Sequence, residues 1–492
     1  LLRVTAGWVS LQSKGRESMA PAGAMCYARP PQGPGTPFFE DASGKFRQAL
    51  EQFDFAGGGA PALTIVLAEA RPRDGLSLFS LLQSVAEADK ERVYERLVAL
   101  VPLPEGVTRV DVLEQKNPEK LSQWREKIEY ISVGIDPSLV PKNTGTLHPT
   151  GTLNKPRYVH TATLLNDERV LVAGGLERDG VALDSTEIYD PATGQFTLAG
   201  RLTTKRVGHT ATLLNDGRVL ITGGSDNTFY FGALASAEIY DPRTNSFRAV
   251  GSMHAVRLAH RATLLPDGKV LITGGQDKVG NKLDTAELYD PVTEGFTVIS
   301  SMHANRDDHT ATLLKSGLVL IVGGGSRREP DEGPLASAEL YDPIKQRFVV
   351  TGSMSVLRYK HSAAMLPDGR VLVMGGSDAR MWSGRYASAE IYDPATGKFT
   401  AAANLNTARY KIRDAVVTLP NGRILIAGGG ARPEVFDPAT GIFAPVAGSI
   451  GATRYYATAT LLKNGEVLIL GGYVSGSQSQ MAADLSAWLY KP

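Results

Sequence analysis

From residue 157 to the C-terminus, apolar and polar residues alternate in short runs, and the whole pattern returns about every 50 residues. An HTATLL-type segment alternates as a β-strand does, an NDGR-type tetrapeptide is a tight hairpin turn, and a VLITGG-type run is apolar enough for a strand buried on both faces. An AEIYDP-type segment and the residues after an ATGQF-type turn add two more strands. The pattern therefore predicts repeated units of four antiparallel strands. Their first residues are Arg157, Arg206, Arg257, Arg306, Arg358, Arg409 and Arg454.

Each copy closes its second strand with two glycines, which allow backbone angles and close approaches that a side chain would block. This repeat, with a period in the range of about 50 residues, resembles the kelch repeat. The resemblance, which is to galactose-oxidase-like propellers, implies a mainly β fold, a seven-bladed kelch-type β-propeller. The glycine pairs are Gly174–Gly175, Gly223–Gly224, Gly274–Gly275, Gly323–Gly324, Gly375–Gly376, Gly428–Gly429 and Gly471–Gly472.

The last copy ends at AWLYKP, one strand short of a complete unit. The segment GTLHPTGTLNKPR before the first copy aligns without gaps with GQFTLAGRLTTKR, so that Leu147 matches Phe196 and Gly151 matches Gly200. We therefore expect residues 145–153 to supply the outer strand of the last blade, and residues 145–492 to form the propeller.

The N-terminal third has a different pattern. Residues 1–56 alternate like short strands and pass into a Pro/Gly-rich loop, residues 57–134 have helical periodicity, and residues 135–144 have the composition of a linker. The stretch VTAGWVSLQSKGRESMAPAGAM resembles the tail of a FecR-like domain, through Gly7-Trp8-Val9, Gly15-Arg16-Glu17 and Ala22-Gly23. FecR-like proteins are extracytoplasmic regulators of sigma factors, so the resemblance implies a periplasmic or extracellular location in a bacterium.

Composition limits the classes of partner. The formal net charge is +1, so no overall field attracts nucleic acid, and we expect no nucleic-acid partner. The longest apolar run, residues 60–68, is too short to cross a bilayer, and no membrane span is expected in this chain. The chain begins without Met or a signal-like segment, and we expect it to be part of something longer.

Arginine, histidine and glutamate recur at fixed places in the copies, which suggests either a ligand ring or a scaffold. Equivalent places on separate blades lie too far apart to share one metal ion. We therefore interpret these residues as scaffold that satisfies the polar groups of each blade, and we expect neither a metal nor a cofactor. The histidines are His160, His209, His260, His309 and His361.

Function is expected where the copies differ, on the loops between the glycine pair and the third strand. These loops carry aromatic side chains beside arginines, a combination suited to a sugar ring or a protein hot spot. Copy six has the shortest such loop and places Asp414 where the histidine would fall. We expect a notch there, flanked by Trp382, Tyr386, Tyr410 and Asp414. The other candidate ligand-binding residues are Tyr230, Phe231, Arg327 and Arg328.

The sequence favours a non-enzymatic binding protein of the bacterial envelope that engages a glycan or a protein partner through its variable loops. Two alternatives stay open. One is an extracytoplasmic enzyme on the same fold, an oxidase or a glycan hydrolase or lyase. The copper oxidases of this fold need a tyrosine cross-linked to a cysteine, and the single cysteine, Cys26, lies outside the repeats. The other alternative is a sensor linked to a sigma factor, like the FecR-like proteins.

Overall fold

The computed structural model divides the chain into two compact units, Leu1–Val140 and Pro141–Pro492. The structure describes residues 2–492 apart from 4–7, 14–15, 22–23, 30–32, 133–142, 178–179, 229–230, 327–332, 381–383 and 476–480. The predicted linker, residues 135–144, therefore lies outside the described residues up to residue 142. Each unit has its own core.

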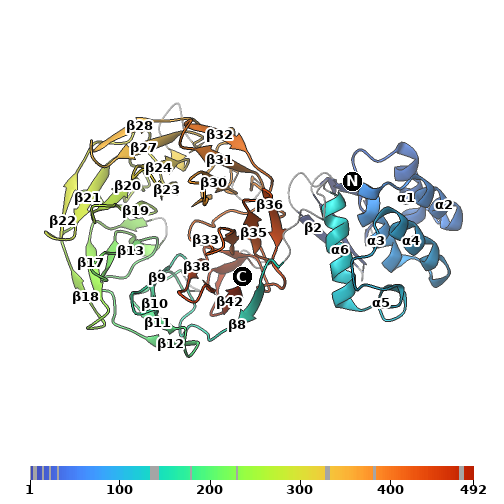
Figure 1. Cartoon of the computed structure of the whole chain (residues 1–492), viewed down its shortest axis with the longest axis horizontal. Helices are drawn as coiled ribbons and strands as arrows, with labels where there is room; N and C mark the ends of the chain where they lie inside the picture. The colour runs from blue at the N-terminus through green and yellow to red at the C-terminus, as the bar shows by residue number, and fades with distance from the viewer. Residues whose placement is uncertain are drawn as a thin grey trace. The chain divides into compact units, whose positions relative to one another are not determined.

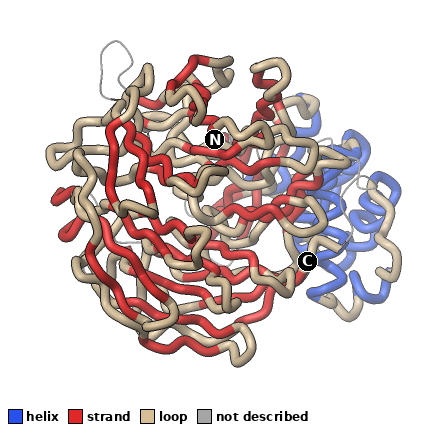
Figure 2. Tube along the Cα trace, turned by 60° about the vertical axis from the view of Figure 1, so that its left-hand side comes forward, coloured by secondary structure: helices blue, strands red, loops and turns tan. Residues whose placement is uncertain are grey.

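The first unit joins short strands to a helical region, whose helices are blue in Figure 2. Strand β4 pairs with β1 and β7, β2 pairs with β3, and β5 pairs with β6. The strands are β1 (Leu2–Arg3), β2 (Trp8–Ser13), β3 (Arg16–Pro21), β4 (Ala24–Cys26), β5 (Ala28–Arg29), β6 (Gly33–Pro34) and β7 (Phe38–Phe39). The helices are α1 (Gly44–Phe55), α2 (Gly59–Glu69), the 3₁₀ turn η1 (Pro72–Asp74), α3 (Gly75–Ser84), α4 (Glu87–Leu100), α5 (Arg109–Leu113) and α6 (Pro118–Ser132).

The helical region begins earlier than the sequence predicted, inside the segment 1–56 that was expected to hold strands. Helix α1 starts at Gly44 because the hydroxyl of Ser43 accepts a hydrogen bond from the Phe46 backbone N–H at 3.1 Å and so caps the helix. Phe46, Ala49 and Leu50 then give it one buried face. The Pro/Gly-rich loop ahead of it hid this short amphipathic stretch.

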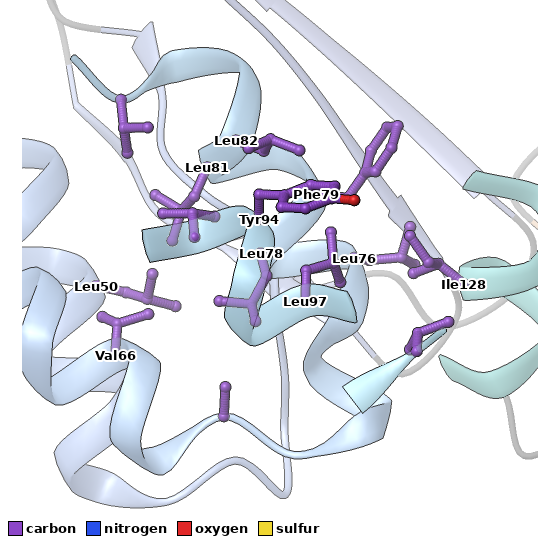
Figure 3. Close-up of a cluster of buried hydrophobic side chains, with 14 of the residues drawn as sticks. Leu50, Val66, Leu76, Leu78, Phe79, Leu81, Leu82, Tyr94, Leu97 and Ile128 are labelled. Atoms are coloured by element: carbon purple, nitrogen blue, oxygen red, sulfur yellow. The ribbon is translucent and has the colours of Figure 1, made fainter. Parts of the chain in front are cut away.

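A core of leucines and aromatic rings holds the helices of this unit together. Figure 3 shows Leu50 of α1 beside Val66 of α2, with Leu78 of α3 and Leu97 of α4 nearby. Trp124 of α6 is fully buried, and its Nε1 donates to the Val101 carbonyl at 3.0 Å. The indole thus fills apolar space while its one polar group is satisfied.

The second unit is a ring of seven four-stranded antiparallel sheets, the blades of a propeller (Figure 1). The predicted fold is confirmed. Blade one is β9 (Thr161–Leu164), β10 (Val170–Ala173), β11 (Thr186–Asp190) and β12 (Gln195–Leu198). Blade two is β13 (Thr210–Leu213), β14 (Val219–Thr222), β17 (Ala237–Asp241) and β18 (Ser246–Ala249). Blade three is β19 (Arg261–Leu264), β20 (Val270–Thr273), β21 (Ala286–Asp290) and β22 (Gly295–Val298).

Blades four to seven repeat this order, and several loops add short hairpins. Blade four is β23 (Thr310–Leu313), β24 (Val319–Val322), β27 (Ala338–Asp342) and β28 (Arg347–Val350), and blade five is β29 (Ser362–Met365), β30 (Val371–Met374), β31 (Ala389–Asp393) and β32 (Lys398–Ala401). Blade six is β33 (Val416–Thr418), β34 (Ile424–Ile426), β35 (Glu434–Asp437) and β36 (Ile442–Pro445), and blade seven has β38 (Thr458–Leu461), β39 (Val467–Leu470) and β42 (Ala487–Lys491). The two hairpins are β15 (Ser225–Thr228) with β16 (Phe231–Ala233) and β25 (Gly325–Ser326) with β26 (Gly333–Pro334), and a three-stranded sheet joins β37 (Arg454–Tyr455), β40 (Tyr473–Ser475) and β41 (Met481–Ala483).

The ring closes without a covalent link, as the sequence predicted. Strand β8 (Thr146–Pro149) pairs antiparallel with β42 and becomes the fourth strand of blade seven. Leu147 lies opposite Tyr490, just as Phe196 lies opposite Tyr189 in blade one. A Cβ at Gly151 would collide with the Gly194 carbonyl, which explains why this position needs glycine. The first and last parts of the propeller thus share one sheet.

Candidate functional site

The first strand of every blade lies nearest the axis of the ring, and each contacts the first strands of its two neighbours (Figure 1). Two residues before each first strand, or five before β33, one residue adopts the left-handed conformation, with φ between 46° and 63°. Each backbone N–H after the first donates to the carbonyl of its counterpart in the preceding blade, at 2.9–3.3 Å. These hydrogen bonds offset the strain of a left-handed conformation at residues with side chains. We call these seven residues the axial ring: Val159, Gly208, Ala259, Asp308, Lys360, Lys411 and Tyr456.

The repeated arginines and glutamates are buried in the scaffold. In blade one, Arg157 Nη2 donates to Glu187 Oε1 at 2.7 Å, and Nη1 donates to the Gly174 carbonyl at 2.8 Å. Glu187 also accepts from the backbone N–H groups of Asn154 and Lys155. The same pairing recurs in blades two to six. The arginine therefore holds the glycine pair and the third strand together, which agrees with the interpretation of these residues as scaffold.

Blade seven replaces this ion pair with a stacking contact. Trp488 stands where the glutamate would be, and the Arg454 guanidinium lies 4.4 Å from the centre of its ring. Arg454 also forms an ion pair with Asp484. A cation–π contact and a second carboxylate therefore take over the role of the missing glutamate.

The repeated histidines join neighbouring blades. His209 Nε2 lies 3.0 Å from the Thr161 hydroxyl of the preceding blade, and His160 Nε2 lies 3.1 Å from Thr458. Burial, reinforced by the charge of Arg206, lowers the pKa of His209 to about 3, so the ring is neutral at physiological pH. The histidines are thus structural contacts between blades, in agreement with the scaffold interpretation.

Two copies depart from the repeat, and their side chains meet at the axis. Blade three has Arg261 where blades one, two, four and seven have threonine, and copy six inserts Arg413 and Asp414. Arg261 Nη1 donates to Asp414 Oδ1 at 3.1 Å, and Arg413 Nε donates to Asp414 Oδ2 at 2.9 Å. Arg261 Nε also donates to the His309 carbonyl at 2.8 Å. One carboxylate from blade six is therefore gripped by two guanidinium groups.

These groups border a cavity of about 140 Å³, which we call the axial cavity. The side chains of Arg261 and Arg413 are 15% and 4% exposed, whereas that of Asp414 is 39% exposed and so reaches solvent. Burial alone would raise the pKa of Asp414, but the charges of Arg413 and Arg261 outweigh it and hold the pKa at about 2. The lining comes from five blades: Thr161, Ala162, Thr163, His209, Thr210, Ala211, Arg261, Ala262, Arg413, Asp414 and Thr458.

The axial ring is apolar on one side and charged on the other. On the charged side, Asp308 Oδ2 lies 4.0 Å from Lys360 Nζ, and Asp308 Oδ1 lies 3.9 Å from Arg413 Nη1. Lys411 is also buried: its Nζ donates to the Tyr473 hydroxyl at 2.7 Å and lies 5.0 Å from the centre of the Tyr410 ring. Burial, with a smaller contribution from the charge of Lys360, lowers the pKa of Lys411 to about 7.

The structure places only part of the predicted site. Asp414 lies in the axial cavity rather than at the histidine position. Ile412 takes that position, since it approaches Gly375 as His209 approaches Gly174. The sequence comparison missed this because the two inserted residues shift the alignment of copy six.

The two described tyrosines of the predicted notch are both tied to the scaffold. Tyr410 is fully buried and packs edge-on against Tyr455, with ring centres 5.4 Å apart. Tyr386 is half-buried and covers the Arg358 guanidinium at 5.4 Å. Trp382, Tyr230, Arg327 and Arg328 lie outside the described residues, as does the side chain of Phe231. The notch and the binding role of these residues stay predictions.

Sequence reasoning missed Arg261, and a signal for it was present. HRATLL in copy three differs from HTATLL in copies one, two and four by a charge on an innermost strand. Asp308, Lys360 and Lys411 likewise place a charge in the axial ring. Copies one to three have the uncharged residues Val159, Gly208 and Ala259 at the same place. A search for departures on the inner strands, in addition to the loops, would have found the axial cavity.

Two kinds of feature are absent from the residues that the structure describes. These residues include no group of three or more His, Cys, Asp and Glu side chains placed to hold a metal ion. Among them there is also no helix long and apolar enough to span a membrane.

The blade order, the glycine pairs and the non-covalent closure define a seven-bladed propeller of the kelch type. Residues 138–384 match the family model described as the Attractin/LZTR1 beta-propeller, and the chain belongs to that family. No curated protein matches the sequence. A solved structure of a fungal alcohol oxidase of the AA5 family, in complex with copper, is 20% identical with a TM-score of 0.55. The match covers 71% of this chain and 77% of the oxidase, and shows a shared fold.

Proposed function

We propose that this protein is a non-enzymatic binding protein of the bacterial envelope, whose propeller engages a glycan or a protein partner through its variable-loop face. One observation carries the proposal. The arginines, glutamates and histidines that recur are buried and bonded to the blades, so they support the ring. The loops that differ between copies are therefore the parts left to recognise a partner.

The nature of the partner follows from the composition of those loops. Aromatic side chains next to arginine concentrate binding energy, either by stacking on a sugar ring or by filling a pocket of a protein. Membership of a propeller family supports an interaction role. The envelope location rests on the resemblance of the N-terminal segment to a FecR-like tail.

A glycan array and a pull-down from a bacterial envelope fraction test the proposal with the full chain. Once a partner is found, Trp382→Ala is expected to weaken binding by about 2 kcal/mol, as loss of an aromatic anchor does. It should leave the melting temperature nearly unchanged, because loop tips contribute little to the core. Titration by calorimetry measures the first effect and thermal unfolding the second.

Asp216→Ala provides the matched control. Asp216 lies in an NDGR-type turn, at the opposite end of the strands from the variable loops, and its carboxylate bonds to Arg218 at 2.7 Å. Arg218 keeps a second partner, Glu294, so the variant should fold and bind normally. Normal binding by Trp382→Ala together with weakened binding by Asp216→Ala would place the site on the other face.

A further inference from the structure

The charged groups of the axial cavity are residues that neither the repeat nor the proposed loop face requires. Its two arginines and its aspartate are the places where copies three and six depart from the common sequence. Arg261 and Asp414 are 153 positions apart in the chain, and the closed ring brings them into contact. A polar group at the centre of a propeller costs desolvation, so an arrangement that gathers two arginines there calls for a physical reason.

The charges around the cavity do not balance. Arg261, Arg413 and Lys360 carry three positive charges, whereas Asp414 and Asp308 carry two negative ones. Lys411, whose pKa is lowered to about 7, adds a fraction of a further positive charge at pH 7, so the net charge is at least +1. Arg413 is 4% exposed, and within the described part of the chain its Nη1 has no hydrogen-bond partner. Its nearest paired carboxylate beyond Asp414, that of Asp308, is 3.9 Å away. A buried excess of positive charge is stabilised by an anion.

We propose that the axial cavity binds a small organic acid that carries one carboxylate and one or more hydroxyl groups. The carboxylate would lie against Arg261 and Arg413, because guanidinium groups bind carboxylates with charge-assisted hydrogen bonds. The ligand hydroxyls would meet Thr163, and the carbon chain the methyl of Ala211. The hydroxyls of Thr210 and Thr458 already bond to His260 and His160. This site is separate from the variable-loop face and does not depend on what that face binds.

Size and charge favour this class of ligand over inorganic anions. A cavity of about 140 Å³ has room for on the order of ten water molecules, far more than one inorganic anion fills. A net charge of +1 is matched by a monocarboxylate, whereas a dianion would leave an excess negative charge beside Asp414. Sulfate, a dianion at pH 7, and phosphate, which is partly a dianion at that pH, therefore serve as the contrasting probes.

Isothermal titration calorimetry of the full chain at pH 7 tests the proposal with lactate, glycerate and gluconate. At least one of these acids is expected to bind with a Kd below about 1 mM. Lactamide and glucose, which lack the carboxylate, should bind at least tenfold more weakly, as should phosphate and sulfate. Equal binding of lactate and lactamide, or no binding of any of the three acids, would overturn the proposal.

Arg261→Thr is the decisive variant, because it installs the residue that copies one, two and four carry at this place. It is expected to weaken binding of the acid at least tenfold without lowering the melting temperature of the ligand-free protein. If this variant does not fold, Arg261→Lys replaces it, because lysine keeps the charge but lacks the guanidinium group that binds a carboxylate through two hydrogen bonds. It should weaken binding by a similar factor. Unchanged binding in a folded variant contradicts the proposal.

Arg243→Thr is the matched control, since Arg243 is an exposed arginine in the turn between β17 and β18, paired with Asp241 at 2.7 Å. It should bind the acid like the wild type. Equal losses in the Arg243 and Arg261 variants would show a nonspecific charge effect and refute the axial site. The array and pull-down results are unaffected by these outcomes, so failure of one proposal does not imply failure of the other.

Discussion

His209 shows how a single repeated side chain stabilises the ring. His209→Ala would leave the Thr161 hydroxyl without its partner. We therefore expect the free energy of unfolding at pH 7 to fall by about 1–3 kcal/mol. The pKa of His209 is lowered to about 3 in the folded protein. As pH falls below about 6.5, the histidine is protonated in the unfolded chain but not in the folded one, and the wild type loses stability. The difference between wild type and variant should therefore shrink from pH 7 to pH 5. Urea unfolding at both pH values measures it.

Partner binding by His209→Ala is expected to be normal, because the histidine only joins blades. A variant that melts like the wild type but no longer binds would move the repeated histidines from the scaffold to the site. A difference in stability that grows toward pH 5 would contradict the buried neutral ring.

Removal of Lys411 is expected to stabilise the protein, whereas removal of His209 destabilises it. Its pKa is lowered to about 7 from an ordinary value of 10.5, so below pH 7 the folded protein must bury a charge. As pH rises from 7 toward 10.5, the unfolded chain holds a proton that the folded chain has lost, and stability increases. Lys411→Met should therefore be more stable than wild type at pH 6, and the gain should shrink by about 1.4 kcal/mol per pH unit above 7.

Lys398→Met is the control for that experiment, because Lys398 is exposed on β32. Its stability relative to wild type should be independent of pH between 6 and 9. A Lys411→Met gain that is equally independent of pH would show that the lysine is not charged at a buried site, and that only its contacts with the tyrosines matter.

At the scale of elements, β8 is the strand on which the ring depends. Deletion of residues 1–152 removes it and exposes the edge of β42, which is then free to pair with other chains. We expect aggregation and a lower melting temperature. Deletion of residues 1–134 keeps β8 and the bonds of Thr144 to Pro445 and Tyr490, and should leave a folded monomeric propeller. Light scattering and thermal unfolding compare the two, and identical behaviour would contradict closure through β8.

The sequence predicted these elements well because each blade repeats the same local signals. Turn residues, glycine pairs and apolar runs fix the strands, and the gapless match of Leu147 with Phe196 was enough to find β8. Helix α1 was missed because its capping residue, Ser43, follows a Pro/Gly-rich loop and its buried face is only a few residues long. Local patterns thus identify elements that recur, and lose those that occur once beside irregular segments.

At the scale of the molecule, the contacts of the axial cavity arise only when the ring has closed. No local pattern relates Arg261 to Asp414, since their distance depends on the number and tilt of the blades between them. The sequence contained two unexplained departures from the repeat, Arg261 in copy three and Arg413-Asp414 in copy six. The closed ring brings Arg261 and Asp414 together as an ion pair. The repeated sequence therefore predicted the blades, but it did not predict the ion pairs at the axis of the ring.

The pairing of β8 with β42 also has a consequence in time. The Tyr490 hydroxyl donates to the carbonyl of Thr144, which lies 346 positions earlier in the chain. At about 5–20 residues per second, a ribosome needs roughly 20 to 70 seconds to make the intervening chain. Throughout that interval β8 has left the ribosome before its partner exists. The last blade is therefore completed only once β42 has been made, and until then, for roughly 20 to 70 seconds, the ring has an open seam.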